Sequence, residues 1–431
     1  MTRRGDQRAG DRSLLVIDGS YTFDAIERLG LEQSVYARDL DGFFSHVWSV
    51  HPFGDVSVTQ GGSGAPEVMK MNPRHSFIQA KPGRFRLLER AFPLNFALAQ
   101  IGLLFRLVRL VKRQRIDLVR AGDPLYVGLL GWTVARLTGR PFMVRINANN
   151  DRIRQSIGGP IYPRLLRSAA LEKRIERFVL PRADLVVAPN QDNVDFAVAN
   201  GAKPDKVEIF RYGNLLSSAH LKPPAERGVD TAVFERLGVE PARYLLCVSR
   251  LQDVKFPEDA VRVLAEVRKA GHDVKLVLAG EGPMRAAVES LAAELGVTNQ
   301  VVLPGNLDQT SLAQVYAHSA ALISPLTGRA LSEAALGGAP IVAYDLDWQR
   351  DLIESGVTGE LIPFRDIEAM GRAVMKFLDG RAYAAEMGAA VRERALDILD
   401  PVKLNAHERA TYARLLGLSA AVEAPCEFVS A

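Results

Sequence analysis

Short, apolar, β-rich runs recur along the first half of the chain and are separated by stretches with helical periodicity. The runs lie at 14–17, 116–119, 142–146, 184–188 and 207–210. Runs that are apolar on both faces are typical of strands buried in a parallel sheet. Their alternation with helices indicates a doubly wound α/β domain.

The same pattern begins again after a linker-like stretch at 222–228. The second set of strand-like runs lies at 244–248, 274–278, 301–303, 321–323 and 340–343. We therefore expect two Rossmann-like domains with doubly wound parallel sheets that face a cleft. In such sheets ligands bind outside the carboxyl ends of the strands, so the residues that follow each run are the candidates for chemistry.

The pattern predicts the following division of the chain. We expect a disordered N-terminus over 1–12, an N-terminal Rossmann-like domain over 13–223, a C-terminal Rossmann-like domain over 224–400, a helix over 401–418 that is able to return to the first domain, and a flexible tail over 419–431.

Composition narrows the class of protein. A chain of 431 residues exceeds what one core usually supports, and a net charge of +4 is too small to indicate nucleic acid as a partner. The two cysteines, Cys247 and Cys426, exclude a disulfide framework and a cysteine metal site. The sequence pattern predicts no apolar run of the roughly 20 residues that a membrane span needs, and the polar N-terminus has no signal-peptide core, so we expect a cytoplasmic protein.

Two cations, Arg250 and Lys255, follow the run at 244–248. An Arg and a Lys on such a loop can neutralise a diphosphate leaving group without a metal, although they can also be ordinary solvated cations. Gly280 and Gly282 follow the next run, and Asn306 follows the one after. Glycines there let a ligand approach the backbone, but similar turns occur in many α/β proteins.

The loop after 321–323 contains Thr327, Gly328 and Arg329 and leads into a short predicted helix that carries Glu333. The free backbone amides at a helix start bind anions. Glu333 can accept hydrogen bonds from a ribose diol, or it can be an exposed helical glutamate, as most are.

These motifs, in this order, carry a resemblance. Ser-Arg-Leu at 249–251 with Lys255 downstream, Gly-Glu-Gly-Pro at 280–283 and Ser-Glu-Ala-Ala-Leu-Gly-Gly-Ala-Pro-Ile-Val-Ala at 332–343 resemble the donor half of glycosyltransferase family four, the group 1 glycosyltransferases, over about residues 240–380. The resemblance implies a GT-B fold and a retaining reaction. It also implies that Arg250 and Lys255 hold the diphosphate, Glu333 takes the ribose hydroxyls, and Gly328 presents amides to phosphate or sugar.

The sequence departs from the family in two places. An earlier glutamate that normally contacts the sugar is replaced by Leu326-Thr327-Gly328-Arg329, which leaves the transferred sugar open and makes Arg329 a candidate third cation. The family's histidine after the strand at 142–146 is absent, because Asn147-Ala148-Asn149-Asn150-Asp151 stands there. The resemblance implies that a donor phosphate oxygen takes the acceptor proton.

Acceptor-side candidates lie in the first domain. They are Gly19 after the run at 14–17, and Asn147 and Asn149 after the run at 142–146. Asp151 is a candidate base or, equally, a helix cap.

Two Asp-x-Asp tripeptides, at 39–41 and 345–347, resemble the metal motif of the other large glycosyltransferase fold. We interpret both as chance occurrences, because the two-domain pattern favours phosphate binding by cations, and we predict no metal. His46 and His51, near Trp48, fit an ordinary alternating strand and are interpreted as structural.

A predicted helix over 94–115 carries Ile101, Leu104, Phe105, Val108 and Val111 on one side, with Arg106, Arg109 and Arg113 offset from them. A second basic stretch spans 164–177. Such helices suit docking on anionic lipid. Equally, the apolar side can pack on the sheet and leave the arginines solvated.

We therefore expect a retaining, metal-independent glycosyltransferase of the hexosyltransferase type. It would move a sugar from a nucleotide diphosphate sugar to a glycan or lipid-linked acceptor in cell-surface polysaccharide synthesis, with no separate cofactor. It would be cytoplasmic, with an anionic membrane surface as a candidate partner. A nucleotide-sugar epimerase of the same fold and a non-catalytic scaffold remain alternatives, whereas a dehydrogenase is disfavoured because no Gly-x-Gly-x-x-Gly follows a strand.

Overall fold

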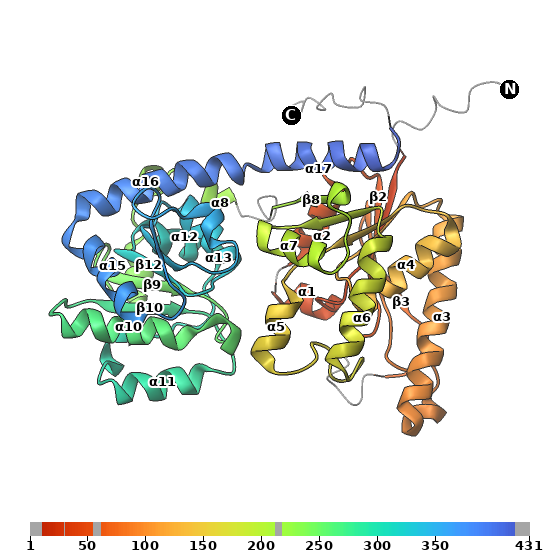
Figure 1. Ribbon diagram of the computed structural model, residues 1–431, viewed down its shortest axis with the longest axis horizontal. Coiled ribbons are helices and arrows are strands. Elements are labelled where there is room, and N and C mark those ends of the chain that lie inside the picture. Colours follow the sequence, from red (N-terminus) through yellow and green to blue (C-terminus); the bar gives the residue numbers. More distant parts are fainter. Residues whose placement is uncertain (1–10, 30, 55–61, 212–217, 419–431) are drawn as a thin grey trace. The chain divides into compact units, whose positions relative to one another are not determined.

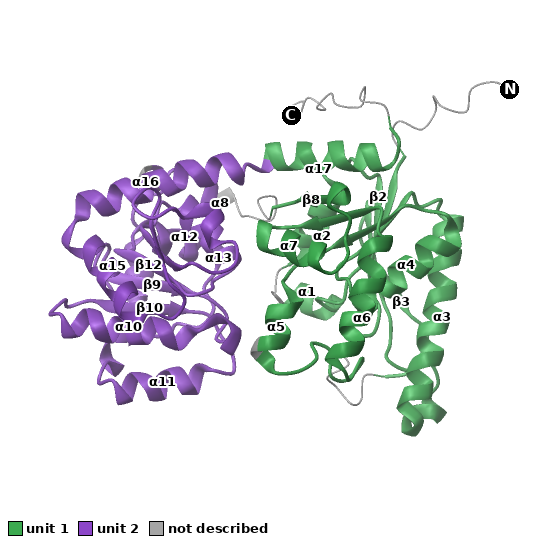
Figure 2. Cartoon of the chain, in the orientation of Figure 1, with its two compact units in different colours: residues 1–211, 402–431 green, residues 212–401 purple. Residues whose placement is uncertain are grey.

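The computed structural model describes residues 11–29, 31–54, 62–211 and 218–418 (Figure 1). The chain forms two compact α/β units: unit 1 comprises residues 1–211 and 402–431, and unit 2 comprises residues 212–401 (Figure 2). The predicted disorder at 1–12 falls almost entirely outside the described residues, and the predicted tail at 419–431 falls wholly outside them.

The units divide after Arg211, earlier than the expected boundary at 223. The segment that resembles a linker is held on unit 2, because the Arg227 guanidinium donates to the carbonyl oxygens of Ala313 at 3.0 Å and His220 at 2.8 Å. His220 Nε2 in turn lies 2.9 Å from Gln309 Oε1. A proline-rich, charged stretch thus belongs to unit 2 because its polar groups find partners there.

Unit 1 contains, within the described residues, an eight-stranded sheet in the order β3-β4-β2-β1-β5-β6-β7-β8. Its strands are β1 (Ser13–Ile17), β2 (His46–His51), β3 (Glu67–Asn72), β4 (His75–Gln79), β5 (Leu118–Ala121), β6 (Phe142–Arg145), β7 (Leu185–Ala188) and β8 (Val207–Ile209). Neighbours are parallel except β3 and β4, which are antiparallel. The apolar pattern does not predict β3, because three of its six side chains are exposed and none is buried.

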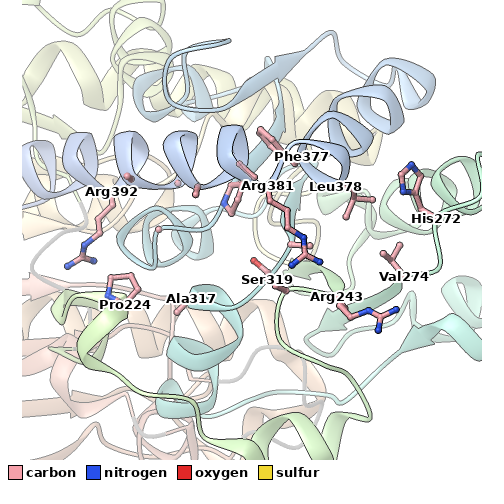
Figure 3. Close-up of a pocket in the computed structure, with 18 of the residues that line it drawn as sticks. Pro224, Arg243, His272, Val274, Ala317, Ser319, Phe377, Leu378, Arg381 and Arg392 are labelled. Carbon is pink, nitrogen blue, oxygen red and sulfur yellow. The ribbon is translucent and has the colours of Figure 1, made fainter.

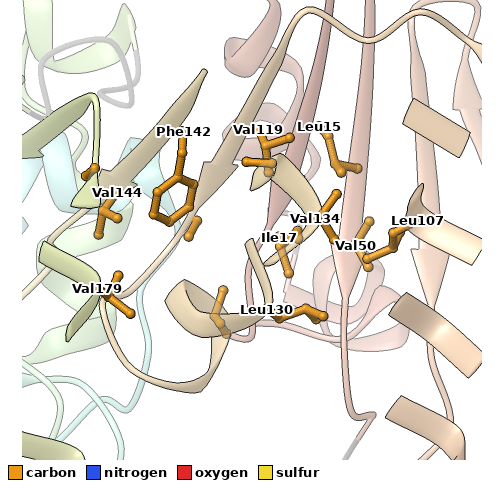
Figure 4. Packing of buried hydrophobic residues seen from close by; sticks show 14 of the residues in the cluster. Leu15, Ile17, Val50, Leu107, Val119, Leu130, Val134, Phe142, Val144 and Val179 are labelled. Carbon is orange, nitrogen blue, oxygen red and sulfur yellow. The ribbon is translucent and has the colours of Figure 1, made fainter. Parts of the chain in front are cut away.

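The helices of unit 1 lie on both faces of this sheet. They are α1 (Phe23–Leu29), α2 (Glu32–Tyr36), α3 (Phe92–Arg113), α4 (Tyr126–Thr138), α5 (Asn150–Ile157), α6 (Ala169–Val179), α7 (Gln191–Ala199) and α17 (Pro401–Leu415), with short 3-10 turns that include η1 (Ala37–Asp39) and η2 (Arg86–Ala91). Leu15 and Ile17 of β1 pack with residues of α3 and α4, such as Leu107 and Val134 (Figure 4). Leu14 and Val16 point the other way, into a cluster that contains Tyr412 of α17.

Unit 2 contains a six-stranded, fully parallel sheet among its described residues, in the order β11-β10-β9-β12-β13-β14. The strands are β9 (Tyr244–Val248), β10 (Lys275–Ala279), β11 (Val301–Val302), β12 (Ala321–Ser324), β13 (Ile341–Tyr344) and β14 (Glu360–Ile362). The helices are α8 (Ser218–Leu221), α9 (Thr231–Leu237), α10 (Pro257–Lys269), α11 (Arg285–Glu294), α12 (Gln309–Ala317), α13 (Arg329–Leu336), α14 (Gln349–Leu352), α15 (Ile367–Asp379) and α16 (Arg381–Ile398). Two doubly wound units confirm the predicted fold class.

Strand order reverses once in each sheet, between β1 and β5 in unit 1 and between β9 and β12 in unit 2. The loops that follow the two strands at such a point diverge to opposite faces and leave a crevice at the carboxyl ends, where ligands of open α/β sheets bind. The loops after β1 and β5, and those after β9 and β12, are therefore the places to search for a site in each unit.

Candidate active site

The loop after β9 is positioned by the close approach of two backbone segments, its own and that of the loop after β10. Gly280, with φ +139°, lies against it so closely that a β-carbon there would be 1.9 Å from the carbonyl oxygen of Ser249. A β-carbon on Gly282 would lie 2.2 Å from the carbonyl oxygen of Leu251, whose amide donates to the Glu281 carbonyl at 3.0 Å. The sequence analysis assigned these glycines to the ligand, but the space above them is filled by the neighbouring loop. A direct contact of either with a donor stays a prediction.

The predicted phosphate-binding residues of unit 2 meet at the start of α13. Lys255, in the 3-10 turn Asp253–Lys255, lies so close to Gly328 that a β-carbon there would be 3.5 Å from Lys255 Nζ. Gly328, at φ +71°, is the N-cap of α13, and no side chain caps the helix. Burial lowers the pKa of Lys255, and the positive charge of the exposed Arg250 lowers it further. The structure therefore places two cations and a helix start together, although their residues are far apart in the sequence.

Asp347 also belongs to this group and was missed. Its negative charge acts on Lys255 and partly opposes the lowering of the lysine pKa. Asp347 is the second aspartate of the tripeptide interpreted as a chance motif, and it follows β13. Its place after a strand of the sheet is the signal that could have identified it.

Thr327 is buried, at 6% exposure, and its hydroxyl lies 2.7 Å from Ser324 Oγ. Gln349 completes the network by donating to the carbonyl oxygens of Pro325 at 3.1 Å and Tyr344 at 2.9 Å. The Thr327 side chain is therefore turned inward and holds the loop after β12. A direct contact of Thr327 with the donor stays a prediction.

Glu333 is buried on α13, with 4% exposure, so it is not an ordinary exposed helical glutamate. Its Oε2 accepts a hydrogen bond from the Tyr316 hydroxyl at 3.1 Å, and its Oε1 lies 3.3 Å from Arg329 Nε. Arg329, predicted as a third phosphate cation, thus pairs with Glu333 one turn along the helix. Asn306 is exposed after β11, and its donor role stays a prediction.

In unit 1, the loops after β1, β5 and β6 meet at the reversal of strand order. A β-carbon on Gly122 would lie 3.0 Å from Asp18 Oδ1, and Asn147 donates to the Gly122 carbonyl at 2.9 Å. The Gly19 carbonyl lies 3.2 Å from His51 Nε2. Gly19 and Asn147, both predicted acceptor-side residues, thus lie on neighbouring loops.

Asp123, in the loop after β5, is a titratable group of this face whose pKa is strongly shifted. Its Oδ2 accepts a hydrogen bond from the Tyr162 hydroxyl at 3.1 Å, and its Oδ1 accepts one from the Leu125 amide at 2.7 Å. Burial, with small contributions from the charges of Asp18 and Glu176, raises the pKa of Asp123 to about 7 despite those hydrogen bonds. Asp123 is not among the candidates predicted from the sequence, because its protonation depends on residues that are distant in the sequence.

Asp151 is a structural anchor. Its carboxylate binds Lys173 Nζ at 2.6 Å, Arg154 Nη2 at 2.7 Å and Asn200 Nδ2 at 3.2 Å. Burial opposes ionisation, but these hydrogen bonds outweigh it and lower the pKa of Asp151 to about 2. A carboxylate held by two cations is a poor proton acceptor at neutral pH, so its selection as a base was wrong.

Asn149, predicted on the acceptor side, is the N-cap of α5. Its Oδ1 accepts the Asp151 amide at 3.1 Å and the Arg152 amide at 3.3 Å, and its Nδ2 donates to Asp192 at 3.1 Å. Its side chain is therefore committed to the helix start, which is the role considered for Asp151.

Three of the four aspartates in the tripeptides interpreted as chance motifs have ordinary ion-pair partners. Asp39 lies 3.5 Å from Arg74, Asp41 lies 3.4 Å from Arg409, and Asp345 lies 2.8 Å from Arg350. His46 and His51 lie on β2, as the alternation predicts, and His51 is 2% exposed.

Unit 2 also has a cavity of about 610 Å³ at the opposite edge of its sheet (Figure 3). Its lining includes Arg243, Val274, Ala320 and Pro340, which directly precede β9, β10, β12 and β13. The cavity lies at the amino ends of these strands, away from the loops that carry Arg250 and Lys255, and is therefore not the candidate donor site.

The two units match two family models that together span most of the chain. Residues 23–213 match the glycosyl transferase 4-like domain, and residues 230–394 match the glycosyl transferases group 1. The chain is a group 1 glycosyltransferase of the family four type. The resemblance of its donor motifs is thereby confirmed, and the second model covers the residues that carry it.

Named relatives of this glycosyltransferase are transferases. The GDP-mannose-dependent α-(1-6)-phosphatidylinositol monomannoside mannosyltransferase of Mycolicibacterium smegmatis is 28% identical over 208 residues, which are 43% of this chain and 53% of that protein. This match thus spans about half of that relative's length. The 2-deoxystreptamine glucosyltransferase of Streptomyces kanamyceticus is 25% identical over 72% of this chain and 80% of that protein.

Solved structures show the same fold at low identity. HepE of Anabaena, in complex with UDP, has a TM-score of 0.70 and 17% identity, over 93% of this glycosyltransferase and 100% of that chain. Sucrose-phosphate synthase of Thermosynechococcus elongatus has a TM-score of 0.69 and 16% identity, over 95% of this chain and 100% of that chain. These likenesses confirm the GT-B architecture.

The contact at Gly280 makes a testable prediction. Gly280→Ala places a methyl group on the Ser249 carbonyl, so we expect the free energy of unfolding of unit 2 to fall by about 2–3 kcal/mol. Gly296→Ala is the control, because Gly296 also has a positive φ, of +70°, but open space around its β-carbon position. Differential scanning calorimetry would measure both variants, and an equal loss would show that backbone strain, and not the loop contact, is responsible.

The raised pKa of Asp123 predicts a pH-dependent stability. The folded state holds the Asp123 proton more tightly than the unfolded state, so this contribution is full below about pH 4 and is lost as the pH rises through about 7. Asp123→Asn removes the charge. Between about pH 5 and pH 8, we expect the free energy of unfolding of the variant to rise relative to that of wild type by on the order of 1–2 kcal/mol. Melting temperatures measured across this pH range would show the change. Asp205 is exposed, so the stability difference between Asp205→Asn and wild type should not change with pH. If the difference between Asp123→Asn and wild type also stayed constant with pH, the raised pKa of Asp123 would be contradicted.

Proposed function

We propose that this glycosyltransferase is retaining and metal-independent, and that it moves a sugar from a nucleotide diphosphate sugar on unit 2 to a glycan or lipid-linked acceptor on unit 1. Its product would belong to a cell-surface polysaccharide. The observation that carries the proposal is the meeting of Lys255 with Gly328 at the uncapped start of α13, beside the charge of Arg250.

The proposed chemistry follows from charge. When the bond between the sugar and the diphosphate breaks, negative charge grows on the leaving phosphate oxygen. Arg250, Lys255 and the amides at the start of α13 can stabilise that charge, and they are held in place before the reaction. The two cations repel one another, which contributes to the lowered pKa of Lys255, and a bound diphosphate would relieve that repulsion.

Glu333 suits the ribose of the nucleotide. Tyr316 and Arg329 hold its carboxylate in one orientation, and a carboxylate retains further lone pairs that can accept hydroxyl hydrogens. The names of two similar proteins also support a nucleotide-bound donor, since one is GDP-mannose-dependent and the other was solved with UDP. Retention rests on the family, in which a donor phosphate oxygen is thought to take the acceptor proton.

Asp123 is the proposed acceptor-binding residue of unit 1. It lies at the reversal of strand order, and Phe53 and Tyr162, whose ring centroids are 6.4 Å apart, flank this region. A carboxylate that accepts a hydrogen bond from Tyr162 retains acceptor capacity for a sugar or lipid hydroxyl. The ionised form of Asp123 would make this contact and so orient the acceptor.

Loss of either phosphate cation should remove transfer without unfolding the protein. We expect Arg250→Ala and Lys255→Ala to lower kcat by about 10²–10³, because each removes charge stabilisation of the leaving group. The release of UDP or GDP from sugar donors would be measured in the presence of EDTA, with thermal shifts by UDP and GDP as the binding readout. Arg243→Ala, which changes a cation at the opposite edge of the same sheet, is the matched control.

Unchanged turnover in Arg250→Ala or Lys255→Ala would refute the phosphate role. Loss of wild-type turnover on adding EDTA would refute metal independence. Conversion of the donor to an isomer without release of nucleotide would instead support the epimerase alternative.

Asp123→Asn should separate acceptor use from donor use. We expect transfer to fall about tenfold or more at neutral pH, while slow hydrolysis of the donor by water and the thermal shift by nucleotide stay unchanged. Wild-type transfer should rise with pH through about 7, and this rise should disappear in the variant. An equal fall in transfer and hydrolysis would place Asp123 outside the acceptor site.

A further inference from the structure

Helix α3 has two apolar faces. Leu103, Leu107 and Val111 recur every four residues, are buried, and pack in the core of unit 1. On the outward side, Leu94, Ile101 and Phe105 are 55%, 51% and 70% exposed. The sequence analysis treated packing on the sheet and an outward apolar face as alternatives, and the structure shows both on one helix. A helix that covers a soluble core needs only the first face.

The segment before α3 extends the outward surface. Leu87 of η2 is 97% exposed, and Phe85 and Phe92, on either side of η2, are 50% and 44% exposed. Six large apolar side chains thus reach solvent from residues 85–105. Concentrations of this kind mark interaction surfaces, whereas single exposed apolar residues need no explanation. These six residues are called the α3 surface below.

The α3 surface is held in shape by Asn95. Its Oδ1 accepts the amides of Arg84 and Phe85, both at 2.8 Å, and its Nδ2 donates to the Phe85 carbonyl at 2.9 Å. A β-carbon on Gly83 would lie 2.6 Å from Asn95 Nδ2, so the chain passes directly over this buried side chain. The apolar residues are therefore presented by an ordered turn and helix.

Positive charge surrounds the α3 surface. Residues 84–113 contain one acidic residue, Glu89, and seven basic ones: Arg84, Arg86, Arg90, Arg106, Arg109, Lys112 and Arg113. Within the described parts of the chain, none of the seven forms a salt bridge. In contrast, Lys173 of the second basic stretch is engaged by Asp151, so that stretch contributes less than the sequence suggested.

Exposed aliphatic and aromatic side chains ringed by cations complement a bilayer with anionic headgroups, because the apolar groups enter the acyl boundary and the cations meet the phosphates. Residues 86–113 also form a stretch long and apolar enough to cross a membrane, which corrects the expectation that none exists. Crossing would require Leu103, Leu107 and Val111 to leave the core. The helix is therefore suited to lie on a bilayer while its inner face stays packed.

We propose that the α3 surface docks unit 1 on an anionic lipid bilayer, with the apolar residues of η2 and α3 inserted at the interface. The surface would hold the acceptor-binding unit where a lipid-linked acceptor is present; that consequence rests on the proposed function, whereas the docking itself does not.

Flotation of the full-length protein with vesicles tests the docking. We expect binding to vesicles that contain phosphatidylglycerol, weaker binding to phosphatidylcholine alone, and weakening as salt is raised. The double variant Leu87→Ser/Phe105→Ser should bind at least about tenfold less, because its apolar anchors are lost. Val229→Ser/Val357→Ser is the matched control, since these residues of unit 2 are 52% and 50% exposed.

Charge is tested separately. Arg106→Gln/Arg109→Gln should weaken binding by about fivefold for each cation, whereas Arg372→Gln in unit 2 should not change it. Equal binding of wild type to both kinds of vesicle, or unchanged binding by Leu87→Ser/Phe105→Ser, would overturn the proposal. If wild type did not float with the vesicles but self-associated, and if Leu87→Ser/Phe105→Ser abolished that self-association, the α3 surface would instead bind a second copy of the chain. Thermal shifts by UDP and GDP should be equal in all variants, so failure of docking and failure of donor binding are distinguishable.

Discussion

The close contact between two backbone segments at Gly280 is the contact on which the donor side of unit 2 depends. The Ser249 carbonyl occupies the position that a β-carbon on Gly280 would take, and the Leu251 carbonyl does the same above Gly282. Because the loop after β9 packs against the loop after β10, the backbone position of Arg250 is fixed. The short 3-10 turn that follows then brings Lys255 to Gly328. Ligand-facing cations are positioned here by backbone packing.

Carboxylates in unit 1 show how surroundings give one chemical group different roles. Asp151 meets Lys173, Arg154 and Asn200, and its pKa falls to about 2. Asp123 is partly buried beside a tyrosine hydroxyl, a backbone amide and two more distant negative charges, and its pKa rises to about 7. The first carboxylate braces α5 and α6, whereas the second can change its charge near neutral pH. The same residue type thus supplies an anchor at one loop and a titrating group at another.

Several predictions from the sequence were correct because they depend on local pattern. Runs that are apolar on both faces located ten of the strands, the alternating pattern around Trp48 located β2, and the order of Arg250, Lys255, the Gly280 turn and Glu333 identified the family. Others failed where a partner comes from elsewhere in the chain. Asn149 and Asp151 were selected from the sequence as acceptor-side and base candidates, but in the fold their side chains bind Asp192 and Lys173. The apolar periodicity of α3 could not distinguish its packed side from its exposed side, because Leu104 and Phe105 are equally apolar in sequence and differ in exposure only in the fold.

The sequence by itself determined the two doubly wound units, the family and the loops that carry the chemistry, because strand and helix periodicity and short motifs are properties of neighbouring residues. Only the tertiary structure decided which side chains on those loops are available. It committed Asn149 and Asp151 to structural contacts, placed the charge of Asp347 near Lys255 and raised the pKa of Asp123. The physical reason is that burial and charge act through space, between residues that the chain order keeps far apart.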